Sequence, residues 1–275
     1  MSFLVRGWHL FRAKGTAVQQ IDTIESHRGK LIAGLERKLE QLQKDLRARD
    51  HYSAPIGYDG RFTLVRLRWR ADFASSRGRL GDENAWSHNY PHAEQNLSAI
   101  VRALTYLDIH DDGNEILALD DPELFKFPMA VMWEPGFWDL TDREAISLRA
   151  YLQKGGFAIF EDFNGLAQWA NFEAQIRRVL PDGRLVRLDS SHQIFSAFFP
   201  MRDVDAIAKP TSTTRPGYYG IFEDNDPARR LLVVANYDNR QPADQEQRGQ
   251  ELFPFGASTE AYKLGVNYMI YGLSH

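Results

Sequence analysis

The chain of 275 residues is 43% hydrophobic and 12% aromatic, which indicates a globular protein and excludes a disordered one. The absence of cysteine excludes thiol nucleophiles, disulfides and thiolate metal sites. The net charge of −4 divides into +3 over residues 1–60 and −7 over the rest, and this mildly acidic body argues against nucleic acid as a partner, because proteins that bind nucleic acid usually present a basic face.

Residues 1–14 mix aromatic and cationic side chains, among them Trp8 and Phe11 beside Arg6 and Arg12. Two interpretations stay open: a short interfacial contact with a membrane surface, or a segment that docks on a protein. The residues lack the continuous apolar run of a signal peptide, and no run of 18 apolar residues predicts a spanning helix. We therefore expect a cytoplasmic location, with a periplasmic or peripheral membrane location as the alternative.

Residues 17–49 carry the longest helical pattern of the chain. Its apolar positions are three and four residues apart, which is the seam spacing of a coiled coil: Ile32, Leu35, Leu39, Leu42 and Leu46. Such a helix would either lie along the globular body or bind a partner helix or a second copy. Residues 53–57 break the pattern and resemble a linker, so we expect an attachment region over residues 1–57 and one domain over residues 58–275.

From Phe62 onward, strand and helix patterns alternate. Strands are predicted over residues 63–69, 115–119, 128–133, 157–160, 218–222 and 231–235, and helices over residues 92–107, 166–180 and 260–273 and from Thr141 to Gly155. The strand over residues 218–222 is expected to pair with the one over 231–235. Short buried strands that alternate with helices predict a mostly parallel sheet in a three-layer α/β/α arrangement.

Residues 140–163 give the clearest local prediction. Thr141 is a good N-cap, and acidic residues follow in the first turn, where the helix dipole favours negative charge. Gly155 and Gly156 end the helix, because its C-terminal turn needs a residue that tolerates positive φ. Residues 157–160 are continuously apolar, as in a strand that is covered on both faces.

Several segments resemble a bacterial family catalogued as domain of unknown function 4159. The similar segments, which occur in the same order as in the family, are YDGRFTLVRLRW, WSHNYPHAEQNL, LALDDPELFKFPMAVMWEPGFWDLTDREAISLRAYLQKGGFAIFEDF and KLGVNYMIYGL. They cover roughly residues 58–273 in patches and leave the predicted N-terminal helix outside. Members of this family often occur as exported or membrane-associated modules.

The family in turn resembles the class I glutamine amidotransferase-like fold. In that fold, a helix, a Gly-Gly turn and a strand lead to a sharp turn that carries a catalytic cysteine. The corresponding turn here, residues 161–164, contains neither cysteine nor serine. The resemblance therefore implies the fold, also described as flavodoxin-like, and a pseudoenzyme without glutaminase chemistry and without a cofactor.

Acidic side chains collect where the predicted parallel strands end, which is where ligands bind in open α/β sheets. The acids are Asp72, Glu134, Glu161, Asp162 and Asp238, accompanied by Arg70 and Asn236. Carboxylates brought together repel, so one of them holds a proton or a cation lies between them. Three interpretations stay open: a Mg²⁺ or Ca²⁺ site, an acid–base pair of a hydrolase, or an inert rim in which the acids pair with Arg68, Arg70 and Arg143.

The histidines give weaker signals. His88 and His92 have the i, i+4 spacing of a zinc pair, but Pro91 lies between them and interrupts a helix, so His92 and Glu94 are expected in the first turn of the next helix. His192 follows two serines and is either a catalytic base or a loop histidine that bonds its own turn.

Aromatic side chains gather in the predicted loops, where Trp133, Phe137 and Trp138 form one cluster and Tyr218 and Tyr219 another. Such residues form either a recognition surface or a lid over the edge of the core. Together with the missing nucleophile, they favour a non-catalytic binding or scaffolding module of a larger assembly, with a protein partner bound through the N-terminal helix and the aromatic loops. The alternative is a hydrolase that uses the acids at the strand ends.

Overall fold

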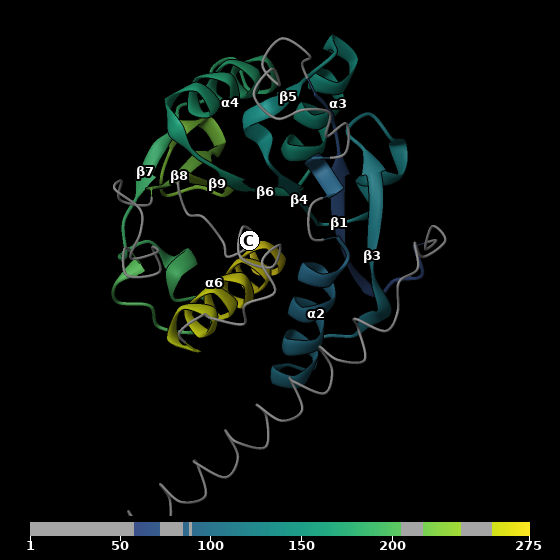
Figure 1. Cartoon of the computed structure of the whole chain (residues 1–275), viewed down its shortest axis with the longest axis vertical. Helices are drawn as coiled ribbons and strands as arrows, with labels where there is room; N and C mark the ends of the chain where they lie inside the picture. Colours follow the sequence, from purple (N-terminus) through teal and green to yellow (C-terminus); the bar gives the residue numbers. More distant parts are fainter. Residues whose placement is uncertain (1–57, 72–84, 88–89, 205–216, 238–254) are drawn as a thin grey trace, which may run out of the picture. The chain divides into compact units, whose positions relative to one another are not determined.

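The computed structural model describes residues 58–71, 85–87, 90–204, 217–237 and 255–275 (Figure 1). The contacts divide the chain between Tyr52 and Ser53, and every described residue belongs to the second unit. The helix predicted over residues 17–49 and the proposed contact residues Trp8, Phe11, Leu35, Leu39 and Leu42 lie outside the described residues.

The described residues form a central sheet of seven strands in the order β3-β1-β4-β6-β9-β8-β7. The first five strands in this order are parallel, and β8 and β7 continue the sheet in antiparallel pairing. The strands are β1 (Phe62–Arg68), β3 (Ile109–Ala118), β4 (Met129–Trp133), β6 (Phe157–Phe163), β7 (Val186–Leu188), β8 (Gly217–Phe222) and β9 (Leu231–Tyr237). The mostly parallel sheet and the pairing of β8 with β9 are therefore confirmed.

Four helices of the described residues pack on the sheet: α2 (His92–Leu104), α3 (Asp142–Gln153), α4 (Gly165–Val179) and α6 (Phe255–Ser274). Side chains of a strand alternate between the two faces, so the sheet contributes to two separate cores. Leu148 of α3 and Phe172 of α4 join one core, and Val101 of α2 and Met269 of α6 join the other. Figure 1 shows α3 and α4 on one side of the sheet and α2 and α6 on the other.

The start of α3 agrees with the sequence prediction. Thr141 Oγ1 accepts a hydrogen bond from the backbone N–H of Glu144 at 3.2 Å, and Glu144 Oε2 accepts one from the backbone N–H of Thr141 at 2.7 Å. This capping box satisfies two N–H groups that have no partner inside the helix. After the helix, Gly155 takes φ +117°, and a Cβ atom at Gly156 would collide with the ring of Tyr151. Both glycines are therefore required, Gly155 for its backbone conformation and Gly156 for the space that Tyr151 occupies.

The strand β6 is longer than predicted. It continues past Phe160 to Phe163, so Glu161 and Asp162 lie within the strand and not in the turn after it. The pairing with β9 is irregular between Phe160 and Phe163, where Asp162 takes φ +60°. The continuous apolar run ends at Phe160, so hydropathy alone marked the end of the strand too early.

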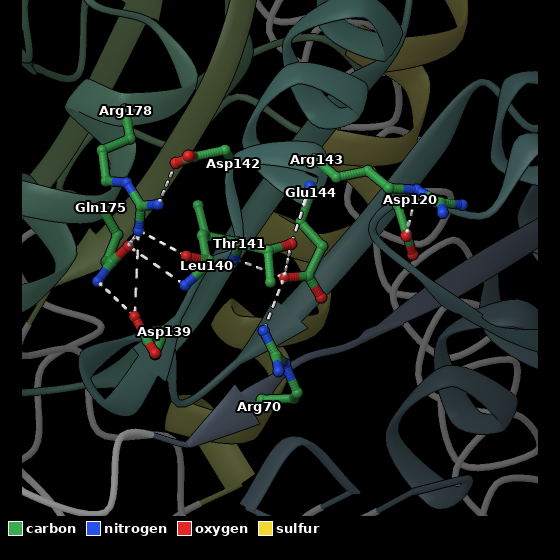
Figure 2. A network of polar contacts seen from close by, with 10 residues as sticks. All are labelled: Arg70, Asp120, Asp139, Leu140, Thr141, Asp142, Arg143, Glu144, Gln175 and Arg178. Atoms are coloured by element: carbon green, nitrogen blue, oxygen red, sulfur yellow. Dashed lines mark hydrogen bonds and ion pairs between the residues drawn. The ribbon is translucent and has the colours of Figure 1, made fainter.

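A polar network links α4 to the segment that leads into α3 (Figure 2). Arg178 Nη1 donates to the carbonyl oxygen of Leu140 at 2.6 Å and to Gln175 Oε1 at 2.8 Å, and Nη2 donates to Asp142 Oδ1 at 2.9 Å. The short antiparallel pair of β2 (Arg70–Ala71) and β5 (Trp138–Asp139) lies beside this network. The network therefore joins two helices on one face of the sheet.

The order of the parallel strands determines where a ligand site would lie. Along the chain, β1 is followed by β3 on one side of it, and the next strand, β4, pairs with the other side of β1. The chain therefore reverses its direction across the sheet between β1 and β4. In open α/β sheets, such a reversal opens a crevice at the carboxyl ends of the strands.

Candidate functional site at the carboxyl ends of the strands

One row of side chains crosses the sheet at its carboxyl edge and faces α2 and α6. Trp133 of β4 pairs in register with Glu161 of β6, and Asn236 of β9 pairs with Tyr218 of β8. The pairing of Phe160 with Ala235 places Glu161 beside Asn236. We call Trp133, Glu161, Asn236 and Tyr218 the edge row. Glu161, Asn236 and Tyr218 each carry a side-chain oxygen that can take part in a hydrogen bond.

Glu161 has an enclosed carboxyl group. Asn236 Nδ2 donates a short hydrogen bond to Glu161 Oε1, and Tyr268 of α6 donates its O–H to Asn236 Oδ1 at 2.8 Å. Asn236 and Tyr268 are buried. Glu161 Oε2 exposes less than 1 Å² and has no hydrogen-bond partner among the described residues. The residue as a whole is only half-buried, but Oε2, one of the two oxygens that share the charge, is enclosed.

Burial controls the ionisation of this carboxyl group. It raises the pKa of Glu161 to about 8, and the nearby charge of Asp162 acts in the same direction. The hydrogen bond from Asn236 favours the carboxylate and opposes the rise, but it is the smaller effect. Burial likewise raises the pKa of Tyr268 well above its ordinary value. Near neutral pH, Glu161 is therefore mostly protonated and uncharged.

Two further acids lie next to Glu161 at this edge of the sheet. Glu134 follows β4 and Asp162 follows Glu161, and both take the left-handed backbone conformation, with φ of 52° and 60°. The backbone N–H of Glu134 donates to the carbonyl oxygen of Glu161 at 2.9 Å. A left-handed residue other than glycine costs about 1 kcal/mol or more, and such strain concentrates at functional sites. Three of the predicted acids thus lie at adjacent strand ends, and of the two neighbours it is Asp162 whose charge acts on the Glu161 carboxyl group.

Two of the three arginines that an inert rim would need, Arg70 and Arg143, are engaged by other acids. Arg70 lies 3.5 Å from Glu144, and Arg143 Nε lies 2.9 Å from Asp120 Oδ2 (Figure 2). Both partners belong to the α3 side of the molecule. Arg70 and Arg143 therefore do not provide the charge compensation that the inert-rim interpretation assigned to them.

A buried ion pair lies next to the edge row, and the sequence analysis did not single it out. Arg66 of β1 donates from Nε to Glu94 Oε1 at 2.5 Å and from Nη1 to the carbonyl oxygen of Trp86 at 2.9 Å. Its guanidinium lies 4.9 Å from the ring of Trp133. Arg66 and Glu94 are 0% and 2% exposed. The sequence offered one signal for a buried Arg66, the alternation of side chains along a strand. Phe62, Leu64 and Arg66 lie on the same face of β1, and that face is buried.

The other predicted polar residues do not join the edge row. Asp72, Asp238 and His88 lie outside the described residues, as does the side chain of His92. The Nδ1 atom of His192 accepts from the backbone N–H of Ile194 at 3.2 Å, and its ring lies 5.5 Å from that of Phe222. Phe222 pairs with Leu231, the first residue of β9, so His192 lies at the opposite edge of the sheet. Burial lowers its pKa.

The aromatic loop packs inward. Trp133 is 8% exposed and Trp138 is 0% exposed, and Trp138 stacks on Phe172 of α4 with ring centroids 6.1 Å apart. Phe137 is half-buried against the same core as Trp138. Tyr218 is also buried. These residues therefore cover the edge of the core, and the interpretation as an exposed recognition surface finds no support in their burial.

Metal binding and membrane spanning also find no support in the part of the chain that the structure describes. Within it, no three His, Cys, Asp or Glu side chains are grouped closely enough to hold a metal ion. No helix there combines the length and the apolar character that crossing a bilayer requires.

Comparison with known proteins identifies a family and no characterised relative. A search of curated proteins finds none that matches the chain. The family model of the domain of unknown function DUF4159 matches residues 72–273. The match includes most of the edge of the sheet described above, although β1 and Arg66 precede it. Because it covers more than half of the 275 residues, the chain belongs to the DUF4159 family.

Proposed function

We propose that this domain binds an organic ligand at the carboxyl edge of its sheet and acts as a hydrolase on an ester or glycosidic bond, with Glu161 as the general acid. The observation that carries the proposal is the enclosed carboxyl group of Glu161, whose Oε2 atom has no partner among the described residues. A strongly perturbed carboxyl group beside strained backbone is typical of a catalytic site.

Hydrolysis of such a bond needs a proton for the leaving oxygen and a second group that activates water or attacks the substrate. A general acid works best when its pKa lies near the working pH, and burial brings the pKa of Glu161 to about 8. Asp162 and Glu134 are acids at the same edge in the described part of the chain, so either is a candidate for the second role. In this proposal Glu161 donates the proton and a neighbouring carboxylate completes the pair.

We also propose that the domain has a three-layer arrangement of the amidotransferase-like or flavodoxin-like kind. Numbered along the chain, the five parallel strands have the order 2-1-3-4-5, which is the flavodoxin-like order. The last residues of β6 include Glu161 and Asp162, directly before the turn that carries the nucleophile in the amidotransferase-like fold. These observations favour a site at the same place as in that fold, with carboxylate chemistry in place of thiol chemistry.

The test is a hydrolysis assay of the full chain with simple alkyl esters and a panel of alkyl glycosides, because their leaving oxygens need a proton. We expect turnover of at least one substrate, a rate that falls as the pH rises through about 8, and a loss of about 10²–10⁴-fold in kcat for Glu161→Gln. Glu173→Gln is the matched control, because Glu173 forms an i, i+4 ion pair with Arg177 on α4. Absence of turnover, or equal rates in both variants, would overturn the proposal.

A second candidate is a non-catalytic scaffolding module of a larger, possibly membrane-associated assembly, attached through residues 1–57. The supporting observation is that residues 161–164 contain neither serine nor cysteine. Pull-downs from membranes and cytosol with the full chain and with a fragment that begins at Tyr58 test this candidate. Recovery of one defined complex by the full chain alone, with no turnover in the hydrolysis assay, would favour it over the hydrolase.

A further inference from the structure

Three polar side chains from three elements form a chain of hydrogen bonds that ends at an unpartnered oxygen. The O–H of Tyr268 on α6 donates to Asn236 Oδ1 on β9 at 2.8 Å, and Asn236 Nδ2 donates to Glu161 Oε1 on β6. The other oxygen, Glu161 Oε2, is enclosed and has no partner among the described residues. This series of hydrogen bonds therefore begins at the phenol of Tyr268 and ends at the carboxyl group of Glu161.

The direction of this chain follows from what each group can donate. Among the described residues, Asn236 Oδ1 is the acceptor for the O–H of Tyr268, and a buried O–H without an acceptor is costly. If the amide of Asn236 were flipped, Nδ2 could donate to the phenol oxygen, but the phenol hydrogen would lose Oδ1 as its acceptor. Tyr268 therefore favours the orientation of the amide that presents Nδ2 to Glu161.

The donor on Asn236 also determines which oxygen of Glu161 can carry a proton. Because Asn236 Nδ2 donates to Oε1, that oxygen acts as the acceptor, and a proton on Oε1 would oppose the donor. A neutral carboxyl group in this setting carries its hydrogen on Oε2, where no described residue accepts it, so the acceptor is left for a ligand to supply. We propose that Tyr268, acting through Asn236, positions the proton of Glu161 on Oε2, and that the site therefore takes an uncharged oxygen acceptor, such as the oxygen of an ester or a glycosidic bond, and not a metal ion or an amine.

This inference rests on the proposed site at Glu161 and names its ligand class. The groups next to the carboxyl group are Asn236 of β9, which donates to Oε1, and Asp162 of β6, while Tyr268 of α6 lies behind Asn236. Glu134 lies at the adjacent strand end, where its backbone N–H donates to the carbonyl oxygen of Glu161. Burial and the charge of Asp162 both disfavour ionisation of Glu161. A neutral carboxyl group donates a hydrogen bond but is a poor ligand for a cation.

The test is a ¹³C NMR pH titration of the full chain with ¹³C-labelled glutamate carboxyl groups. The signal of Glu161 is assigned by its loss in Glu161→Gln. We expect it to titrate near pH 8 in the wild-type chain. In Tyr268→Phe the amide is free to flip, so the hydrogen bond that favours the carboxylate is lost and the midpoint rises. Asn236→Leu removes the same donor and should move the midpoint in the same direction.

Tyr271→Phe is the matched control, because Tyr271 lies one turn further along α6, is equally buried, and accepts a hydrogen bond from the backbone N–H of Leu231 at the other edge of the sheet. It should leave the midpoint of Glu161 unchanged. Equal midpoints in Tyr268→Phe, Tyr271→Phe and the wild-type chain would overturn the positioning role of Tyr268. Titration of Glu161 in the ordinary acid range would overturn the whole inference.

Repeating the titration with millimolar Mg²⁺ tests the ligand class. We expect the midpoint of Glu161 to stay in place, because the protonated group does not bind the ion. A fall of the midpoint with Mg²⁺ would identify a cation site and overturn the inference. None of these measurements requires turnover, so a failed hydrolysis assay would overturn the proposed function while the titration still decides whether Glu161 is protonated and whether Tyr268 acts on it.

Discussion

Glu161 and Arg66 show two ways in which a charged residue is accommodated inside this domain. Arg66 is fully buried and keeps its charge because Glu94, the carbonyl oxygen of Trp86 and the ring of Trp133 surround it. Glu161 has a neutral amide as its hydrogen-bond donor, and burial favours its protonated form. The first arrangement supports the fold, whereas the second leaves a group that can give up a proton.

Glu161 should make the stability of the protein depend on pH. Its pKa rises from an ordinary value of 4.5 in the unfolded chain to about 8 in the folded one. Between these values the folded state holds a proton that the unfolded state has lost, so the free energy of unfolding falls as the pH rises through this window. The full effect is at most about 5 kcal/mol, at about 1.4 kcal/mol for each pH unit.

Glu161→Gln removes this ionisation and keeps the shape of the protonated side chain. We therefore expect the variant to match the wild-type chain near pH 4.5 and to become progressively more stable than it up to about pH 8. Urea unfolding curves at several pH values measure the difference. Glu173→Gln serves again as the control, and a constant difference between Glu161→Gln and the wild-type chain across the window would contradict the prediction.

Removing one member of the buried ion pair should be costly. Arg66→Met leaves the carboxylate of Glu94 buried without its cation, and we expect a loss of about 3–5 kcal/mol in the free energy of unfolding. The double variant Arg66→Met, Glu94→Met replaces both charges by apolar side chains and should recover most of that loss. Chemical denaturation of the three proteins measures this. A double variant no more stable than Arg66→Met would show that the pair acts through packing and not through charge.

At the scale of elements, local sequence signals worked best where one residue controls the backbone. The beginning of α3 at Asp142 and the Gly-Gly turn after it follow from Thr141, Gly155 and Gly156, and all three act as predicted. The predicted end of β6 at Phe160 was wrong. The strand continues through two acids that no hydropathy pattern would include. Pairing with β4, where Trp133 aligns with Glu161, holds this polar segment in the sheet.

The capping box of α3 gives a prediction at this scale. Thr141→Ala removes the oxygen that accepts from the backbone N–H of Glu144, and we expect a loss of about 1 kcal/mol in the free energy of unfolding. Thr141→Ser keeps that oxygen and should stay close to the wild-type value. Thermal or urea unfolding of the two variants provides the comparison, and equal losses in both would point to the methyl group of Thr141 as the important contact.

At the scale of the whole molecule, the described residues contain two cores, one on each face of the seven-stranded sheet. Each core includes side chains from several of the parallel strands and from two helices. The strands are shared by the two cores, so we expect the faces to unfold together. The site lies where several of these shared strands end, and its geometry depends on the register of the entire sheet.

The division of contacts between Tyr52 and Ser53 predicts that residues 53–275 fold without the preceding residues. We expect the fragment Ser53–His275 to unfold in a single cooperative transition with the midpoint of the full chain. Far-ultraviolet circular dichroism during heating measures both proteins. A fragment that is unfolded, or that melts well below the full chain, would show that residues 1–52 contribute to the stability of the domain.

The sequence by itself determined the alternation of strands and helices, the mostly parallel sheet and the caps of α3, because these depend on hydropathy period and on the conformational preferences of single residues. It also identified Glu134, Glu161 and Asp162 as strand-end acids. Only the tertiary structure decided that Asn236 and Tyr268 join Glu161, that His192 lies at the opposite edge, and that Trp133 and Trp138 point inward. The physical reason is that strand order and register bring together residues far apart in the chain, and burial then changes the chemistry of a carboxyl group that looks ordinary in the sequence.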